Sequence, residues 1–263
     1  MEAIISRQNS KVKEIVALCD SARLRRESGR CVAHGVKLCL EAVRLGLRLK
    51  ELWVTSSVWV RQEPEIVMLA EAADERYEMS DSVCEKISPE RSPQGVAAVI
   101  AIPRQAEIEL LAARKRLIAL DGVQDPGNVG AVTRTAAALG YGGMLLSAGC
   151  ADPFAPKTLR ASMGAVFGVE LAPCDLAPAL EQIKKRGHAV VALTLEPSAE
   201  NICEAAKLLK KHHAVLVIGS EGKGISPQVR AMCDGAVMIP MTDRAESLNA
   251  AVAAGIAMWA FSC

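Results

Sequence analysis

The stretch DGVQDPGNVGAVTRTAAALG, residues 121–140, decides the fold of this 263-residue chain. It follows the largely apolar run Arg116 to Leu120, which predicts a buried strand. It leads into a helix that we expect from about Val129 to Leu139, closed by Gly140. A polar, glycine-rich loop between a strand and a helix is typical of α/β sheets, and ligands of such sheets bind at the carboxyl ends of the strands. The loop therefore predicts one wall of a binding site.

The alternation of strands and helices continues to the C-terminus. Short apolar runs predict further strands at residues 143–147, 188–194, 214–220 and 236–241. Apolar strands separated by helical stretches indicate a parallel sheet covered on both faces. The tail at residues 248–263 is the most apolar part of the chain and predicts a buried helix. The fold class expected here is α/β with a parallel sheet.

The first hundred residues predict a smaller α/β domain. The expected strands are residues 30–33, 49–55, 76–79 and 95–102, and the expected helices are residues 9–20, 36–45, 64–73 and 81–87. Pro103 and the polar run from Arg104 to Arg116 interrupt this pattern. We therefore divide the chain into two domains, residues 1–105 and 106–263, each of ordinary domain length.

Composition restricts the functional classes. No run reaches the roughly 18–20 apolar residues of a membrane span, and the N-terminus has no apolar stretch of signal-peptide type, so we expect a cytoplasmic protein. The nine cysteines form no C-x-x-C pair, and no Cys or His has zinc-site spacing, so reduced, buried thiols and no metal are expected. Aromatic residues make up only 3% of the chain, so base stacking should not dominate any recognition of nucleic acid.

Charge is segregated although the formal net charge is only +1. Residues 1–50 hold eleven basic and five acidic residues, whereas residues 51–105 hold five basic and ten acidic residues. A surface that faces phosphate groups would carry this pattern, and so would an ordinary solvated helix face.

Three polar segments, the first two of them rich in glycine, follow the predicted strands: residues 121–130 with Arg134, residues 219–225, and residues 239–249. One such loop is weak support for a site, because turns use Gly, Asn and Asp for steric reasons. Three of them at one edge of a sheet predict a site. Lys223 precedes glycine instead of Ser or Thr, so the second segment is not a P-loop, and no strand is followed by G-x-G-x-x-G. ATP hydrolysis and hydride transfer are therefore not expected.

The three segments resemble the SpoU/TrmH family of RNA 2′-O-ribose methyltransferases, in the SPOUT superfamily. The likeness lies in DPGNVGAVTRTAAALG (residues 125–140), VLVIGSEGKGIS (residues 215–226) and IPMTDRAESLNAAVAAGIAMW (residues 239–259), with weaker similarity at residues 158–167 and 92–99. The motifs occur in family order, and the resemblance covers residues 20–260. It implies methyl transfer from S-adenosylmethionine to a ribose 2′-hydroxyl of a structured RNA.

The resemblance also implies the architecture. It predicts a C-terminal α/β trefoil-knot domain and a smaller N-terminal α/β domain like a ribosomal protein, with residues 33–46 as its most recognisable stretch. It further implies a homodimer with active sites at the subunit interface. The two-domain layout and RASMGAVF (residues 160–167) are more similar to the ribosomal RNA members than to the transfer RNA members. A tRNA 2′-O-methyltransferase and a non-catalytic RNA-binding or ribosome-assembly protein with this fold stay open as alternatives.

The resemblance assigns site residues by class. The catalytic set is Arg134, Asn128, Glu221, Ser247 and Asn249. The cofactor-binding set is Gly219, Ile239 and Leu248, joined by Thr194 because it ends a strand that faces the same pocket. The RNA-binding candidates are Arg23, Arg25, Arg26, Arg30, Lys157 and Arg160.

Arg134 has two possible roles in the chemistry. A guanidinium costs roughly 7 kcal/mol to neutralise at pH 7. This favours a role in stabilising the developing alkoxide while a phosphate or water accepts the proton. The family proposals make this arginine the base, and the sequence leaves both roles open.

Overall fold

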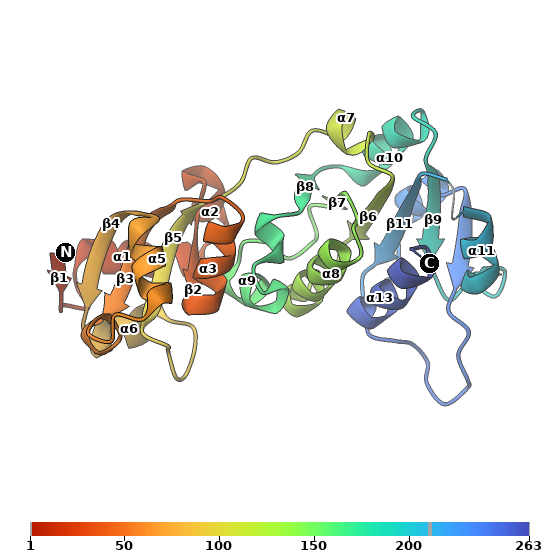
Figure 1. Ribbon diagram of the computed structural model, residues 1–263. Helices are drawn as coiled ribbons and strands as arrows, with labels where there is room; N and C mark the ends of the chain where they lie inside the picture. The colour runs from red at the N-terminus through yellow and green to blue at the C-terminus, as the bar shows by residue number, and fades with distance from the viewer. Residues whose placement is uncertain (1, 210–211, 263) are drawn as a thin grey trace. The chain divides into compact units, whose positions relative to one another are not determined.

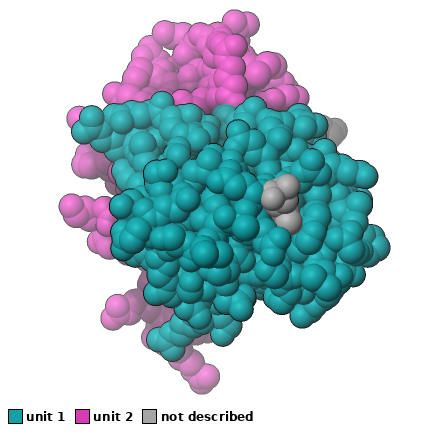
Figure 2. Space-filling model, turned by 90° about the vertical axis from the view of Figure 1, so that its left-hand side faces the viewer, with its two compact units in different colours: residues 1–103, 152–167 teal, residues 104–151, 168–263 magenta. Residues whose placement is uncertain are grey.

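The computed structural model describes residues 2–209 and 212–262 and divides into two compact units. Unit 1 consists of the chain up to Pro103 together with Asp152–Phe167, and unit 2 of Arg104–Ala151 and the chain from Gly168 onward (Figure 2). The sequence division placed the boundary after residue 105 and predicted two continuous domains. The structure differs in that Asp152–Phe167 packs with unit 1.

Unit 1 contains a mixed five-stranded sheet with the strand order β1-β4-β3-β5-β2. The strands are β1 (Glu2–Ile4), β2 (Arg30–His34), β3 (Leu49–Thr55), β4 (Ala73–Met79) and β5 (Val96–Ala101). The helices are α1 (Ser10–Asp20), α2 (Ala22–Ser28), α3 (Val36–Arg44), α4 (Ser56–Trp59), α5 (Pro64–Glu71), α6 (Asp81–Ile87) and α9 (Pro156–Ser162), followed by a 3₁₀ turn at Ala165–Phe167. β1, β4 and β3 are parallel, whereas β5 is antiparallel to β3 and β2.

Helix α1 shows why these segments fold as they do. Its N-cap Asn9 accepts a hydrogen bond from the Lys11 amide, which satisfies one of the free amides of the first turn. Val12, Ile15 and Leu18 recur at helical spacing and pack into the core beneath the sheet. Ser21 alone separates α1 from α2. Gly29, with φ of 62°, ends α2 and leads into β2.

Unit 2 contains a seven-stranded sheet with the order β10-β12-β9-β11-β6-β7-β8, and every one of its pairings is parallel (Figure 1). The strands are β6 (Arg116–Asp121), β7 (Gly143–Leu146), β8 (Glu170–Pro173), β9 (Ala189–Leu193), β10 (Glu200–Asn201), β11 (Ala214–Gly219) and β12 (Gly235–Met238). The helices are α7 (Ile108–Leu111), α8 (Pro126–Ala138), α10 (Leu176–Lys184), α11 (Ile202–Leu209), α12 (Pro227–Met232) and α13 (Ala250–Ala260). The predicted α/β fold class is confirmed.

Helix α8 starts earlier than predicted. The Asp125 carboxylate accepts a hydrogen bond from the Asn128 amide at 3.0 Å, and Pro126 occupies the first helical position. A capping aspartate followed by proline starts a helix before its apolar repeat becomes visible. Asn128 therefore lies on the first turn of α8.

Helix α13 returns the end of the chain to the beginning of unit 2, as the knot implied by the resemblance requires. It contacts α8 and β11. Ala254, Ala257 and Met258 are fully buried on one side. The expectation of a buried helix is wrong for the other side, where Trp259 is 61% exposed.

Candidate functional site

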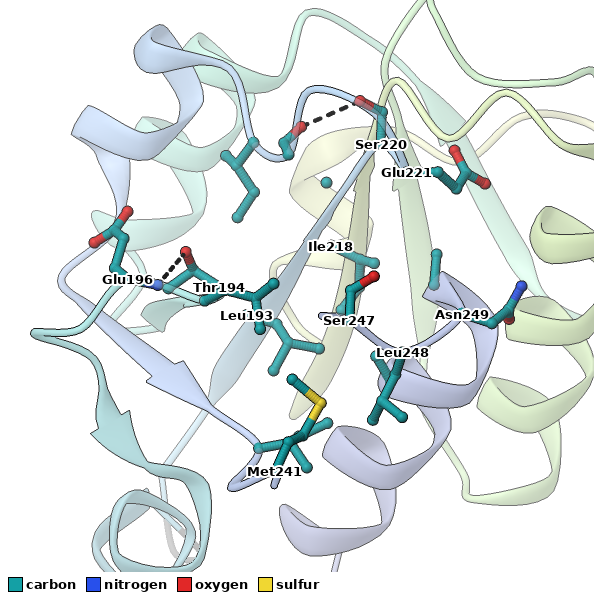
Figure 3. A pocket seen from close by; sticks show the side chains of 17 residues that line it. Leu193, Thr194, Glu196, Ile218, Ser220, Glu221, Met241, Ser247, Leu248 and Asn249 are labelled. Atoms are coloured by element: carbon teal, nitrogen blue, oxygen red, sulfur yellow. Dashed lines mark hydrogen bonds between the residues drawn. The ribbon is translucent and has the colours of Figure 1, made fainter. Parts of the chain in front are cut away.

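The chain segments that follow β9, β11 and β12 enclose a pocket of about 640 Å³ (Figure 3). The three strands are parallel, so their carboxyl ends meet at one edge of the sheet. Apolar side chains form much of the wall, among them Leu193, Ile218 and Met241. Pockets of this size with few polar groups are typical of small-molecule sites.

The end of β11 is packed so tightly that only glycine fits at position 219. A Cβ atom on Gly219 would lie 2.2 Å from the carbonyl carbon of Gly224 and 2.4 Å from the amide nitrogen of Ile225. The turn is closed by reciprocal backbone hydrogen bonds of 3.0 Å between Ser220 and Gly224, and Gly224 has φ of +66°. The pocket wall at this point is therefore backbone in a fixed conformation.

A second anchor holds the other end of this turn. Asp121, at the end of β6, accepts a hydrogen bond from the Ser226 amide at 2.7 Å through its carboxylate. Ser226 is the residue before α12. The turn is thus tied to the neighbouring strand at its exit.

A chain of side-chain hydrogen bonds joins the three predicted motifs. The Asn249 side-chain nitrogen, Nδ2, donates to Asn128 Oδ1 at 3.0 Å. The Asn128 side-chain nitrogen, Nδ2, donates to Glu221 Oε1 at 2.6 Å. Glu221 and Asn249 lie on the rim of the pocket, on the side of α8 (Figure 3). Because both ends of the Asn128 amide are engaged, its orientation is fixed.

Asn249 also starts the last helix. Its side-chain oxygen accepts from the amides of Ala251 at 2.9 Å and Val252 at 3.2 Å. One residue therefore caps α13 and holds Asn128 in place.

The structure brings most of the predicted site residues together. The residues that line the pocket include Thr194, Gly219, Ile239 and Leu248 from the cofactor-binding set, and Glu221, Ser247 and Asn249 from the catalytic set. Asn128 joins them through its hydrogen bonds. Their roles stay predictions, because position alone assigns no chemistry.

Glu196 also lines this pocket, although no sequence motif indicated it. Its carboxylate accepts two hydrogen bonds of 2.9 Å from Arg230, and this guanidinium lowers the pKa of Glu196. Arg230 stands 34 residues away in the chain. The only signal was that Glu196 closely follows Thr194 at the end of β9.

Arg134 stands apart from the pocket. It is exposed on α8 and is not among the residues that line the pocket. Within residues 2–209 and 212–262 it has no hydrogen-bond or ion-pair partner. Ala137 and Ala138, three and four residues on, are exposed on the same helix face. Its guanidinium is thus available to a bound substrate or to a second chain.

The RNA-binding candidates fall into two groups. Arg25 is only 3% exposed and forms an ion pair with Asp152, so the prediction that it contacts RNA phosphates is wrong. The other five candidates have exposed or half-buried side chains: Arg23, Arg26, Arg30, Lys157 and Arg160. Arg23 forms an ion pair with Glu27, Arg30 with Glu14 and Arg160 with Glu90. Their contacts with RNA stay predictions.

Three further features concern the described part of the chain. It contains no group of three or more His, Cys, Asp or Glu side chains placed to hold a metal ion, and none of its helices has the length and apolar character needed to cross a bilayer. Its eight cysteines form no disulfide. Cys203 is exposed, against the expectation of buried thiols, and Cys263 lies outside the described residues.

Comparisons with known proteins match both parts of the chain. The model of the SpoU rRNA Methylase family matches residues 115–259, and the model of an MRM3-like substrate binding domain matches residues 9–98. The 23S rRNA (guanosine(2553)-2′-O)-methyltransferase RlmP of Bacillus subtilis is 30% identical over 259 residues, which is 98% of each chain. The 23S rRNA (uridine(2479)-2′-O)-methyltransferase of Streptomyces viridochromogenes is 27% identical over 95% of this chain and 88% of its own length. The AdoMet-bound rRNA methyltransferase from Sinorhizobium meliloti superposes with a TM-score of 0.86 at 29% identity, over 99% of this chain and 97% of its own.

Proposed function

The chain belongs to the SpoU rRNA methylase family, and on this premise we propose that it transfers a methyl group from S-adenosylmethionine to a ribose 2′-hydroxyl of ribosomal RNA. The observation that carries the proposal is the pocket with the Asn249–Asn128–Glu221 chain on its rim. The similarity to RlmP and to the uridine 2′-O-methyltransferase, both 23S rRNA methyltransferases, supports ribosomal RNA as the substrate class.

The pocket fits S-adenosylmethionine. The Gly219 turn leaves no room for a side chain, so a flat ring can lie directly against backbone. Ile239 and Leu248 supply apolar walls, while Thr194 and Ser247 offer hydroxyl groups. When bound, the cofactor supplies an electrophilic methyl group on a sulfonium.

The residues of the chain have to align the acceptor and remove its proton. Transfer requires the 2′-oxygen in line behind the methyl carbon, and a well-oriented pair of reactants gains several kcal/mol over free reactants, up to about 7–11 kcal/mol. Asn128, fixed between Glu221 and Asn249, keeps the three loops at constant spacing and so maintains the rim that receives the ribose. Arg134 stabilises the negative charge that develops on the oxygen, and a phosphate or water takes the proton.

The exposed face of α13 supports the proposal of a homodimer. Val252, Ile256 and Trp259 recur at i, i+4 and i+7 and are 51%, 39% and 61% exposed. Such an apolar stripe is typical of a protein interface. In a two-fold symmetric dimer the stripes of the two copies pack against each other, so one interface buries both.

Arg134 would join that interface. Helix α8 contacts α13, and Arg134 shares its exposed face with Ala137 and Ala138. Since the pocket of its own chain does not include Arg134, we propose that it serves the pocket of the second copy. At a cofactor concentration far below the dissociation constant of Gly219→Ala, mixing the Arg134→Ala and Gly219→Ala variants should then restore part of the transfer, because one site of each mixed dimer is intact. A mixture as inactive as its two components would contradict the shared site.

Unit 1 would supply RNA affinity. Five of the six RNA candidates keep accessible cations there, and phosphate contacts of this kind make binding fall steeply with salt. We also propose a cytoplasmic location, which the bacterial source of the similar ribosomal RNA methyltransferases supports.

The proposal is tested by mapping 2′-O-methyl groups in total RNA from cells with and without the gene. We expect one or more ribosomal RNA positions to lose the modification, and a plasmid copy to restore it. An Arg134→Ala copy should fail to restore it. Unchanged ribosomal RNA, or loss only from a transfer RNA, would refute the assignment to ribosomal RNA.

A further inference from the structure

The segment that follows β9 forms one wall of the pocket, and the proposed transfer assigns no role to two of its residues. Leu195 and Glu196 line the pocket directly after Thr194. Leu195 is 56% exposed, and Pro197 and Ser198 are exposed as well. A loop with so few buried side chains is held only weakly by packing, so its position depends on its hydrogen bonds and ion pairs.

Helix α12, in the same unit, is anchored at both ends. At its start, the Ser226 amide donates a hydrogen bond of 2.7 Å to the Asp121 carboxylate at the end of β6. At its end, Lys184 Nζ of α10 donates to the Met232 carbonyl oxygen at 3.0 Å, and α10 contacts α12. The helix can therefore serve as a fixed support for the loop after β9.

Arg230 connects this helix to the loop. Its Nε donates to Glu196 Oε1 and its Nη2 to Glu196 Oε2, each at 2.9 Å. The two side chains are 33% and 40% exposed, so the ion pair is partly shielded from solvent. A planar guanidinium that engages both carboxylate oxygens fixes their relative orientation. The Glu196 amide also donates to Thr194 Oγ1 at 3.2 Å (Figure 3). Leu195, between these two residues, is thus held at the pocket.

An exposed leucine at a pocket wall gains free energy when a ligand covers it, because apolar surface leaves water. The adenine of S-adenosylmethionine has a flat face that can cover such a side chain. We propose that Leu195 packs against the bound cofactor and that Glu196 and Arg230 are positioning residues that hold Leu195 in place. This inference rests on the proposed function, which supplies the cofactor.

The alternative is an ion pair that only stabilises the fold. Such a pair would leave the contribution of Leu195 to cofactor binding unchanged after the pair is broken. A positioning pair makes that contribution depend on Arg230. The two roles therefore differ in whether the effects of substitutions at Leu195 and Arg230 on affinity are additive.

Four substitutions and one double variant separate these roles. Leu195→Ala removes the apolar contact, and Arg230→Met removes the donors to Glu196 while keeping a long side chain. Glu196→Gln removes the charge and keeps the shape, which gives a second way to break the pair. Lys207→Met is the control, because it breaks an exposed ion pair with Glu204 in the same unit, where the side chains are 71% and 67% exposed. The double variant combines Leu195→Ala with Arg230→Met.

The experiment titrates each full-length variant with S-adenosylhomocysteine in a calorimeter, at temperatures where the variant is folded. Leu195→Ala should raise the dissociation constant roughly 3- to 15-fold, since about half of a leucine side chain loses its cover. Arg230→Met and Glu196→Gln should raise it by a similar factor, and Lys207→Met should not change it. In the Arg230→Met background, Leu195→Ala should add less than about a further twofold. Wild-type affinity in Leu195→Ala, or an equal cost of Leu195→Ala in both backgrounds, would overturn the inference.

A second readout follows the loop itself. Amide hydrogen exchange at residues 195–199 should be faster in Arg230→Met and Glu196→Gln than in the wild type, and unchanged in Lys207→Met. Exchange at the wild-type rate in both pair variants would refute the positioning role. These measurements need no methyl transfer. If the wild-type protein bound S-adenosylhomocysteine with the expected coupling but methylated no ribose, the proposed function would fail while this inference stood.

Discussion

Replacement of Gly219 by alanine tests whether the backbone turn after β11 forms the cofactor site. The added Cβ would lie 2.2, 2.4 and 2.6 Å from three backbone atoms of Gly224 and Ile225. Ordinary contacts of carbon are about 3.5–4.0 Å, so the turn has to move by more than about 1 Å. Overpacking of this kind costs about 1–3 kcal/mol.

That cost should appear as lost affinity, since the displaced turn is a wall of the pocket. At 1.4 kcal/mol for each factor of ten, we expect the dissociation constant for S-adenosylmethionine to rise roughly 5- to 150-fold. Gly222→Ala is the matched control, because a Cβ at Gly222 meets no atom within 4 Å. Calorimetric titration of both variants, at temperatures where each is folded, gives the comparison. Wild-type affinity in Gly219→Ala, or an equal loss in Gly222→Ala, would refute the reasoning.

Three other substitutions test separate parts of the account. Arg134→Ala should slow single-turnover transfer by roughly 10²- to 10³-fold with cofactor affinity unchanged in calorimetry, because its partner is the reacting oxygen; a loss of cofactor binding with normal turnover at saturation would overturn this role. Asn128→Asp places a carboxylate oxygen against Glu221 in place of the amide donor at 2.6 Å. Because this hydrogen bond is exposed, we expect a destabilisation of only about 0.5–1.5 kcal/mol in thermal or chemical unfolding, together with slower transfer; transfer at the wild-type rate would show that the bond to Glu221 does not matter for the reaction. Trp259→Glu introduces a charge into the exposed stripe of α13 and should shift the protein from dimer to monomer in analytical ultracentrifugation, whereas a dimer of unchanged stability would place the interface elsewhere.

The sequence predicted the pocket because each strand, and the polar segment that follows it, can be recognised from neighbouring residues alone. Parallel strands end at one edge, so the polar segments after β11 and β12 had to meet there whatever their separation in the chain. The third predicted segment, after β6, does not line the pocket and is linked to it through the hydrogen bonds of Asn128. The family resemblance assigned Gly219, Ile239 and Leu248 to the cofactor, and the strand end assigned Thr194; all four line the pocket.

Contacts between distant residues could not be predicted in this way. Arg25 lies in a basic cluster and looked like a surface cation, but its partner Asp152 is 127 residues away. For the same reason, the sequence did not indicate that Arg230 pairs with Glu196 or that Asp152–Phe167 packs with unit 1. Periodicity reports which face of a helix is buried, whereas the identity of a buried partner depends on the completed fold.

The identity of the acceptor atom is the central claim, and a 2′-deoxy substrate tests it most directly. The target nucleotide in a minimal ribosomal RNA fragment is replaced by its 2′-deoxy analogue, with every base and phosphate retained. Binding should weaken by only about 0.5–1.5 kcal/mol, the typical contribution of one hydrogen bond, while transfer of labelled methyl should vanish because the nucleophile is gone. Transfer of methyl to the 2′-deoxy substrate at the rate of the ribose substrate would contradict the account and place the reaction on a base.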